Sequence, residues 1–238
     1  NILFANENIH LTIESETHNN AIRSILLDKN KDLITISEDK TIKVWDSKNN
    51  KLKSTIYGQI DIGYVGRLNH AAYNEKINNL AVSGDFAQNQ ENYEMYKIRI
   101  YDMNSNKIYK TIENKNGIVS NLEFSSDGKF LVTGFTSPIY HFSIYETSSY
   151  KIVDDIKIVE RYLPKRYHHF KLKIIQKKDD YLIITVSELG DIDIYSKKQK
   201  KFIQSLNIKQ NITALYVDDD FIYVGFDGGI NKYDVNLN

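Results

Sequence analysis

Four residues near the start of the chain have the types from which a hydrolase site is built. They are a histidine, a hydroxyl, an acid and a nearby tryptophan: His18, Thr35 or Ser37, Asp39 and Trp45. A nucleophilic hydroxyl needs a histidine base that is oriented by an acid. The same residues also suit a buried network, because a buried indole N–H needs an acceptor and a hydroxyl can extend the network to His and Asp. We expect the structural role, with Ser37 as the hydroxyl.

Other candidate catalytic or metal-binding residues are acids and histidines that lie side by side. The acids are Asp154-Asp155, Asp179-Asp180 and Asp218-Asp219-Asp220. Paired carboxylates can perform acid–base catalysis or hold a hard cation, but the last two sets fall at expected turns, where Asp is favoured by its turn geometry. His168 and His169 are consecutive on an expected strand and point to opposite faces. We therefore predict no catalytic residues, no metal and no cofactor.

The elements that must position these residues repeat along the chain. Trp45-Asp46 ends a segment of alternating apolar and polar residues, and weaker copies end at Tyr101-Asp102, Tyr145-Glu146, Tyr195-Ser196 and Tyr233-Asp234. An apolar run that ends in small residues lies upstream of each copy. Alternation with a period of two indicates strands with one buried face, and self-similarity at such intervals indicates a repeat architecture. The sequence thus predicts an all-β fold of repeated sheets.

The segment that ends at Trp45-Asp46, with His18 upstream, resembles one blade of a WD-repeat β-propeller. The resemblance implies four-stranded antiparallel blades, of which five WD-like repeats are visible in this chain. They form either a five-bladed ring or part of a seven-bladed one. It also implies that His18, Ser37, Asp39 and Trp45 are the structural tetrad of the family, a set that the other repeats lack because Tyr replaces Trp.

We expect a single propeller domain over residues 1–238. The expected blades cover residues 21–57, 66–113, 117–158, 167–208 and 211–234. The last of them has only three expected strands, and the alternating segment 10–14 is expected to supply the fourth. In this family an N-terminal strand commonly completes the last blade, which removes exposed sheet edges.

Composition narrows the classes of function. The formal net charge is zero, which argues against a dedicated nucleic-acid binder, and no apolar run is long enough to cross a membrane. The chain has no Cys, which excludes thiol catalysis, thiolate metal sites and disulfides. The sequence leaves the cellular compartment of the protein open. It could be cytoplasmic, or it could be periplasmic or secreted if Ile2 to Ala5 is the remnant of a signal peptide.

The resemblance implies a non-catalytic scaffold that binds a protein or peptide on the face formed by the connections between blades. Arg and Tyr are enriched at binding hot spots. The expected binding residues are Arg161, Tyr162, Lys165, Arg166 and Tyr167, followed by Arg67 and Tyr93.

Two alternatives to the scaffold stay open. The chain could be the sensor or regulatory portion of a larger protein, linked covalently to a separate effector domain. It could instead be a propeller enzyme that uses a metal or a quinone in the central channel. No cluster of His or acids recurs across the repeats, which argues against the enzyme.

Overall fold

The computed structural model describes residues 16–86, 97–113, 117–136, 141–158 and 170–238. All regular structure in them is β-strand, arranged in five antiparallel sheets that follow the order of the sequence. The expected all-β fold is confirmed, and the chain is a five-bladed β-propeller. Its strands are rich in Ile, Val, Thr and Tyr, which favour a pleated and half-buried surface.

Four of the blades have four strands. Blade 1 contains β1 (Ile22–Leu27), β2 (Leu33–Ser37), β3 (Thr41–Trp45) and β4 (Leu52–Tyr57). Blade 2 contains β5 (Leu68–Asn74), β6 (Asn79–Gly84), β7 (Lys97–Asp102) and β8 (Lys107–Glu113). Blade 3 contains β9 (Val119–Phe124), β10 (Phe130–Phe135), β11 (His141–Glu146) and β12 (Lys151–Lys157). Blade 4 contains β13 (Phe170–Lys177), β14 (Asp180–Ser187), β15 (Asp191–Ser196) and β16 (Lys201–Asn207).

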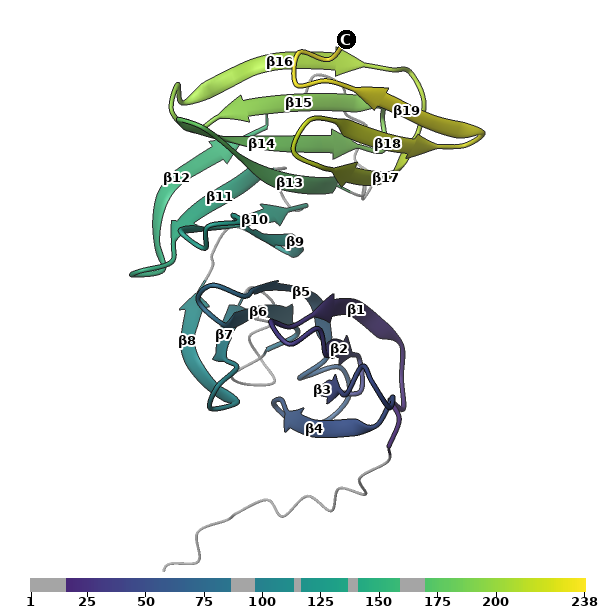
Figure 1. The fold of residues 1–238 in the computed structure, drawn as a ribbon, viewed down its shortest axis with the longest axis vertical. Helices are drawn as coiled ribbons and strands as arrows, with labels where there is room; N and C mark the ends of the chain where they lie inside the picture. The colour runs from purple at the N-terminus through teal and green to yellow at the C-terminus, as the bar shows by residue number, and fades with distance from the viewer. Residues whose placement is uncertain (1–15, 87–96, 114–116, 137–140, 159–169) are drawn as a thin grey trace, which may run out of the picture.

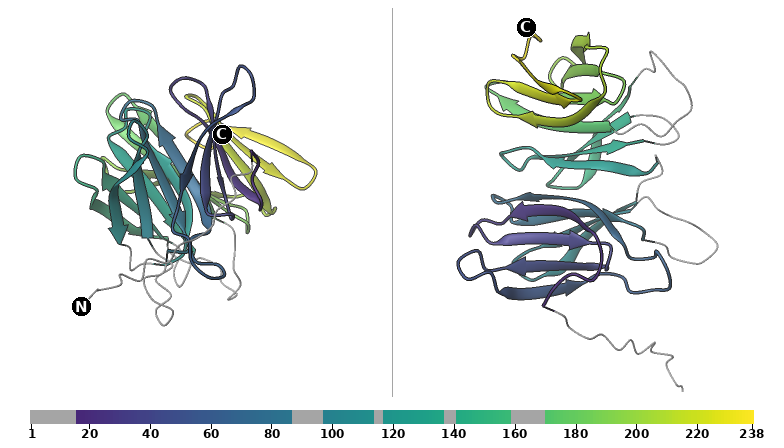
Figure 2. Two further views of the ribbon diagram at one scale, coloured as in Figure 1. Left: turned by 90° about the horizontal axis from the view of Figure 1, so that it is seen from below. Right: turned by 90° about the vertical axis from the view of Figure 1, so that its right-hand side faces the viewer.

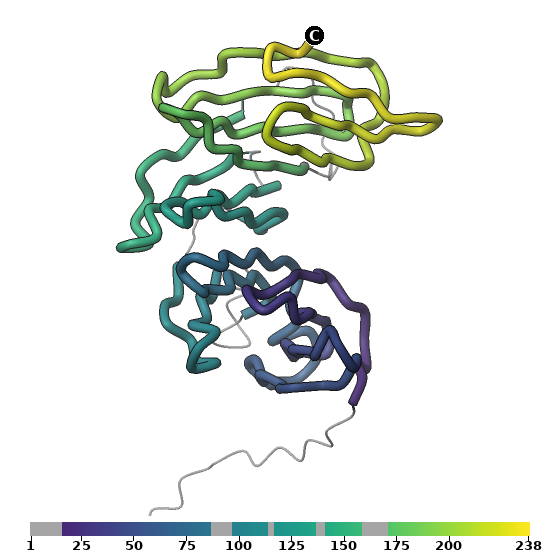
Figure 3. Tube along the Cα trace, viewed as in Figure 1, coloured from purple at the N-terminus to yellow at the C-terminus, as the bar shows by residue number. Residues whose placement is uncertain are grey.

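Blade 5 has three strands among the described residues. They are β17 (Ile212–Val217), β18 (Ile222–Phe226) and β19 (Gly229–Tyr233). The strand expected over 10–14 lies outside the described residues, so its place in this blade stays a prediction. Blades 1 and 2 lie at the lower end of the molecule in Figure 1, and blades 4 and 5 lie at the upper end. Figure 2 shows the same succession of sheets from a second side, and Figure 3 traces the chain to its C-terminus at the upper end.

All five blades share one position in their strand register. The aromatic residue of each third strand lies directly opposite an aliphatic residue of the second strand, in the pairs Trp45–Leu33, Tyr101–Leu80, Tyr145–Leu131, Tyr195–Ile183 and Tyr233–Ile222. In blades 1 to 4 a register shift beside this residue follows in the pairing with the fourth strand. The turn before that fourth strand contains one residue with positive φ, namely Asn50, Asn106, Tyr150 or Lys200.

The core lies between the blades, because each sheet has two apolar faces. We call the face that carries the register aromatic the proximal face and the opposite one the distal face. Side chains alternate between the two along every strand. Between blades 2 and 3, the distal Ala72, Ala81 and Ile100 pack with the proximal Leu122 and Tyr145. Three further apolar clusters fill the other junctions in the same way.

The antiparallel strand order places the loops at two opposite ends of each blade. The turns between first and second strands and between third and fourth strands lie at one end of each blade, which we call the turn face. The connections between blades lie at the other end, together with the loops between second and third strands. We call that end the loop face, and the Gly58 N–H of one connection donates to the Lys40 carbonyl of such a loop over 2.9 Å.

Candidate functional site

The polar residues singled out in blade 1 converge on one hydroxyl. The Trp45 indole N–H donates to Thr35 Oγ1 over 2.8 Å, and Thr35 Oγ1 lies 2.7 Å from His18 Nε2. The other ring nitrogen, His18 Nδ1, lies 2.8 Å from Asp39 Oδ2. A chain of donors from Trp45 through Thr35 and His18 to the Asp39 carboxylate satisfies every member when the imidazole is neutral and carries its proton on Nδ1.

The hydroxyl in this network belongs to Thr35, which corrects the expected assignment to Ser37. Ser37 is fully buried, donates to the Asn20 carbonyl over 3.1 Å and accepts the Asp39 N–H over 3.1 Å. The side chains of Thr35 and Ser37 point to the same face of β2, because they are two residues apart on one strand. Leu33 pairs with Trp45 across the sheet. Thr35 is two residues from Leu33 along β2 and Ser37 is four, so the Trp45 indole reaches Thr35 and not Ser37. The Ser37 hydroxyl instead fixes the loop that carries Asp39.

Asp39 is held as a carboxylate by its surroundings. Burial alone would raise its pKa, but hydrogen bonds from His18, Thr41 and the Asn19 N–H outweigh that effect and lower the pKa below its ordinary value. The Thr35 hydroxyl is buried and already bonded on two sides, so it has no opening to a substrate. The geometry therefore suits stabilisation of blade 1 rather than nucleophilic catalysis.

The paired acids hold turns and outer strands together. Asp155 accepts the Ser143 hydroxyl over 2.6 Å, and Asp154 lies 3.4 Å from the Lys200 ammonium. Asp180 accepts the Ser196 hydroxyl, and Asp218 accepts the Phe221 N–H over 2.7 Å within its own turn. No group of three or more His, Cys, Asp or Glu residues among the described ranges is placed to hold a metal ion. His168 and His169 lie outside those ranges.

Most of the expected binding residues cannot be placed in the fold. Arg161, Tyr162, Lys165, Arg166, Tyr167 and Tyr93 lie outside the described residues, so their role stays a prediction. Arg67 is described, and it lies on the loop face just before β5. Its guanidinium carbon lies 4.2 Å from the centre of the Tyr64 ring, and its Nη1 lies 3.4 Å from Glu38 Oε2. Glu38 also binds Arg23 of β1, so Arg67 joins two blades.

The connection that contains Tyr64 is tied down along its length. The Gly66 N–H donates to the Asp85 carbonyl over 2.7 Å, and the Arg67 N–H donates to the Tyr64 carbonyl over 3.0 Å. Gly66 has a φ of +95°, and a Cβ there would lie 1.7 Å from the Gln59 carbonyl oxygen. Only glycine fits this close approach of two backbone segments. Residues 58–66 thus form a fixed loop, which we call the blade 1–2 connection.

The blade 1–2 connection exposes large apolar side chains. Ile62 is 79% exposed and Tyr64 is 67% exposed, with Ile60 beside them at 38%. Sequence reasoning singled out Arg67 but missed Ile62 and Tyr64. The available signal was an aromatic and three aliphatic residues between glycines 58 and 66, in a segment that must lie on the loop face. An exposed Tyr stacked with an Arg on a fixed backbone is a combination suited to protein recognition.

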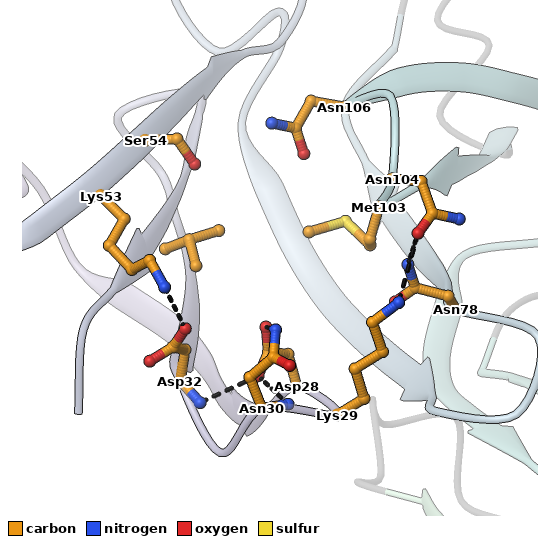
Figure 4. Close-up of a pocket in the computed structure, with 11 residues that line it drawn as sticks. Asp28, Lys29, Asn30, Asp32, Lys53, Ser54, Asn78, Met103, Asn104 and Asn106 are labelled. Atoms are coloured by element: carbon orange, nitrogen blue, oxygen red, sulfur yellow. Dashed lines mark hydrogen bonds and ion pairs between the residues drawn. The ribbon is translucent and has the colours of Figure 1, made fainter. Parts of the chain in front are cut away.

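A hollow lies on the turn face, between blades 1 and 2. It has a volume of about 370 Å³. Figure 4 shows two polar contacts along its floor: Lys53 with Asp32 at 2.6 Å, and Lys29 with Asn104 at 3.2 Å. Its lining has two acids, two lysines and four asparagines, with Val44 and Met103 as the apolar part. The charges of the lining balance, so the hollow suits a small neutral polar group better than an ion.

The central channel is the place where the enzyme alternative would put its chemistry. The first strands of neighbouring blades contact one another, and the Lys173 ammonium of β13 lies 2.8 Å from Glu123 Oε1 of β9. Burial lowers the pKa of nearby His70 to about 4, assisted by the positive charges of Arg23 and Lys171. These residues differ from blade to blade and do not form the repeated donor set that a central metal needs.

Comparison with known proteins agrees with this architecture. Residues 10–46 match the family model described as WD domain, G-beta repeat. The matched segment contains the whole network of His18, Thr35, Asp39 and Trp45. No curated protein sequence matches the chain. No helix in the described part of the chain is long and apolar enough to cross a membrane.

Proposed function

We propose that this chain, which belongs to the WD-repeat β-propellers, is a non-catalytic scaffold that binds a protein or peptide on its loop face. The family-model match and the five blades support the family, and propellers of this family are commonly interaction scaffolds. The observation that carries the proposal is the blade 1–2 connection, where Ile62 and Tyr64 are exposed on a fixed backbone beside Arg67.

The blade 1–2 connection suits partner binding because little conformational entropy is lost when its surface is ordered. The connection is already held by the Gly58 and Gly66 hydrogen bonds, so a partner would not have to fix its backbone. Exposed apolar side chains that are rigidly presented lose little conformational freedom on binding. The Arg67–Glu38–Arg23 contacts add a polar rim, which is the usual border of a hot spot. A protein surface or peptide with an apolar centre and acidic flanks fits this combination.

The absence of catalysis belongs to the same proposal. The Thr35 hydroxyl is buried in its network, and the paired acids are bonded to neighbouring side chains and turns. Asp154, Asp155, Asp180 and Asp218 thus each have a structural partner. Residues 161, 162, 165, 166, 167 and 93 of the sequence analysis lie outside the described residues, so their part in partner binding stays a prediction from the sequence.

The proposal is tested by enrichment of partners from source-cell extract, with quantitative mass spectrometry as the measurement. The baits are the 238-residue chain, its Tyr64→Ala variant and its Tyr109→Ala variant. Tyr109 is the matched control, because it is 62% exposed, against 67% for Tyr64, and lies at the turn-face end of β8. We expect a partner that is retained by wild type and Tyr109→Ala and is depleted roughly tenfold or more on Tyr64→Ala. Equal retention on all three baits would contradict the proposed site.

A further inference from the structure

A hollow of about 590 Å³ lies on the turn face between blades 2 and 3, and we call it the blade 2–3 hollow. Its volume falls within the range of small-molecule binding sites. Blade 2 contributes Asn79, Asp102 and Tyr109 to its lining, and blade 3 contributes Asp127 and Thr147. The hollow is therefore separate from the loop face, on which the protein partner is proposed to bind.

The blade 2–3 hollow has a counterpart one junction earlier, in the hollow of Figure 4. Tyr109 is the equivalent of Lys53, because each directly follows the fourth-strand partner of the register aromatic. Asn79 is likewise the equivalent of Asp32, because each directly precedes the second-strand partner of that aromatic. In the earlier hollow Lys53 and Asp32 form an ion pair of 2.6 Å and satisfy each other. In the blade 2–3 hollow a tyrosine and an asparagine replace this ion pair.

The ring of Tyr109 is exposed and yet held in place. Its side chain is 62% exposed, and its ring centre lies 6.3 Å from that of Tyr150, with the two planes at 64°. Tyr150 is buried, and its hydroxyl accepts the Asn79 side-chain N–H over 3.0 Å. Tyr109 thus rests on a side chain that blade 2 itself fixes. A ring that is ordered but uncovered loses little conformational freedom when a ligand stacks on it.

Two ionised carboxylates share the lining with this ring. Hydrogen bonds, led by that from the Asn104 N–H, lower the pKa of Asp102 below its ordinary value. Burial would raise the pKa of Asp127, but hydrogen bonds, led by that from Tyr181, outweigh it and lower the pKa to about 2. A carboxylate has about four acceptor positions, and Asp102 receives three hydrogen bonds from its own turn. Asp102 can therefore accept a further hydrogen bond from a ligand.

An ordered aromatic ring beside carboxylate and amide groups matches the chemistry of a neutral saccharide. The C–H groups on one face of a pyranose ring pack on an aromatic ring, and its hydroxyls both donate and accept hydrogen bonds. We propose that the blade 2–3 hollow binds a neutral saccharide, with Tyr109 as the stacking platform and Asp102 and Asn79 as hydrogen-bonding partners. An anionic ligand fits less well, because Lys129 offsets only one of the two carboxylates of the lining.

Saturation-transfer difference NMR on the 238-residue chain tests this proposal. The probes are maltotriose, cellotriose and triacetylchitotriose as neutral saccharides, and trialanine as a small peptide. Tyr109→Ala removes the platform, and Tyr109→Phe keeps the ring. Tyr64→Ala is the matched control, because Tyr64 is exposed to a similar extent on the loop face. The fluorescence of Trp45, the single tryptophan, reports whether each variant is folded. If Tyr109→Ala fails to fold, Tyr109→Thr, which suits a strand, replaces it.

We expect wild type, Tyr109→Phe and Tyr64→Ala to transfer saturation to at least one of the saccharides. Tyr109→Ala should bind that saccharide roughly five- to tenfold more weakly. The proposal is overturned if the folded wild type transfers saturation to none of the saccharides, or if Tyr109→Ala transfers as well as wild type does. Transfer to trialanine as strong as that to the saccharides would also overturn it. Each of these failures leaves the proposed function intact, because that function depends on Tyr64 and expects Tyr109→Ala to retain the protein partner.

Discussion

At the scale of single residues, the hydroxyl of Thr35 is the centre of the network that anchors residues 16–20 to blade 1. The sequence identifies His18, Asp39 and Trp45 as candidates, because their types and spacing resemble one repeat. It does not distinguish Thr35 from Ser37, since both lie on the same face of β2 and both carry hydroxyls. The choice depends on the cross-strand position of Trp45, which becomes visible only when the strands are paired.

Replacement of Thr35 by Val should therefore lower the stability of the chain. The change keeps the shape of the side chain but removes the acceptor of the Trp45 N–H and a partner of His18. We expect a loss of about 1–3 kcal/mol in the free energy of unfolding, measured by urea denaturation, and a shift in Trp45 emission. Thr35→Ser is the control, because it restores the hydroxyl. If the Ser variant loses as much stability as the Val variant, the hydroxyl is not the stabilising group.

His70 should make stability depend on pH. Its pKa in the folded chain is lowered to about 4 by burial, with Arg23 and Lys171 adding to the effect, whereas the unfolded chain has the ordinary value of 6.5. As the pH falls from about 6.5 to about 4, the unfolded state takes up a proton that the folded state refuses, so stability decreases. His70→Asn should reduce this slope, measured as unfolding midpoints at a series of pH values. Parallel curves for the variant and wild type would show that His70 does not contribute.

At the scale of elements, the strands are the best-predicted part of the molecule. An alternation of apolar and polar residues indicates a strand directly, and the aromatic at the end of each third strand marks the register. The blade 1–2 connection could not be predicted in the same way. Its shape depends on the approach of Gly66 to the Gln59 carbonyl, and no local pattern reports a contact between two backbone segments. The exposure of Ile62 and Tyr64 follows from that contact.

Two glycines of this connection provide a matched pair of substitutions. Both have positive φ, but a Cβ at Gly63 would meet nothing within 4 Å, whereas a Cβ at Gly66 would lie 1.7 Å from the Gln59 oxygen. Gly63→Ala should cost only the backbone strain, about 1–2 kcal/mol. Gly66→Ala should cost clearly more, measured by urea denaturation, and should weaken partner binding. Equal costs would mean that the connection is not held as the structure has it.

At the scale of the whole molecule, the sequence predicts the five repeats but not how deeply the side chains on each blade face are buried. Each repeat has two apolar faces and cannot bury both by itself, so stacking of blades follows from the pattern. The sequence does not reveal how far each apolar side chain is buried, because Ile25 and Leu122 occupy equivalent places in the register, yet Ile25 is 64% exposed and Leu122 is 4% exposed.

The central claim is that the loop face, and not the turn face, receives a partner. Hydrogen–deuterium exchange of the full chain, alone and bound to a protein enriched by the wild-type bait, tests it most directly. We predict slower exchange in residues 58–67 on binding, with unchanged exchange in the turn-face segments 28–32 and 46–51. Protection confined to the turn-face segments, with residues 58–67 unaffected, would contradict the account.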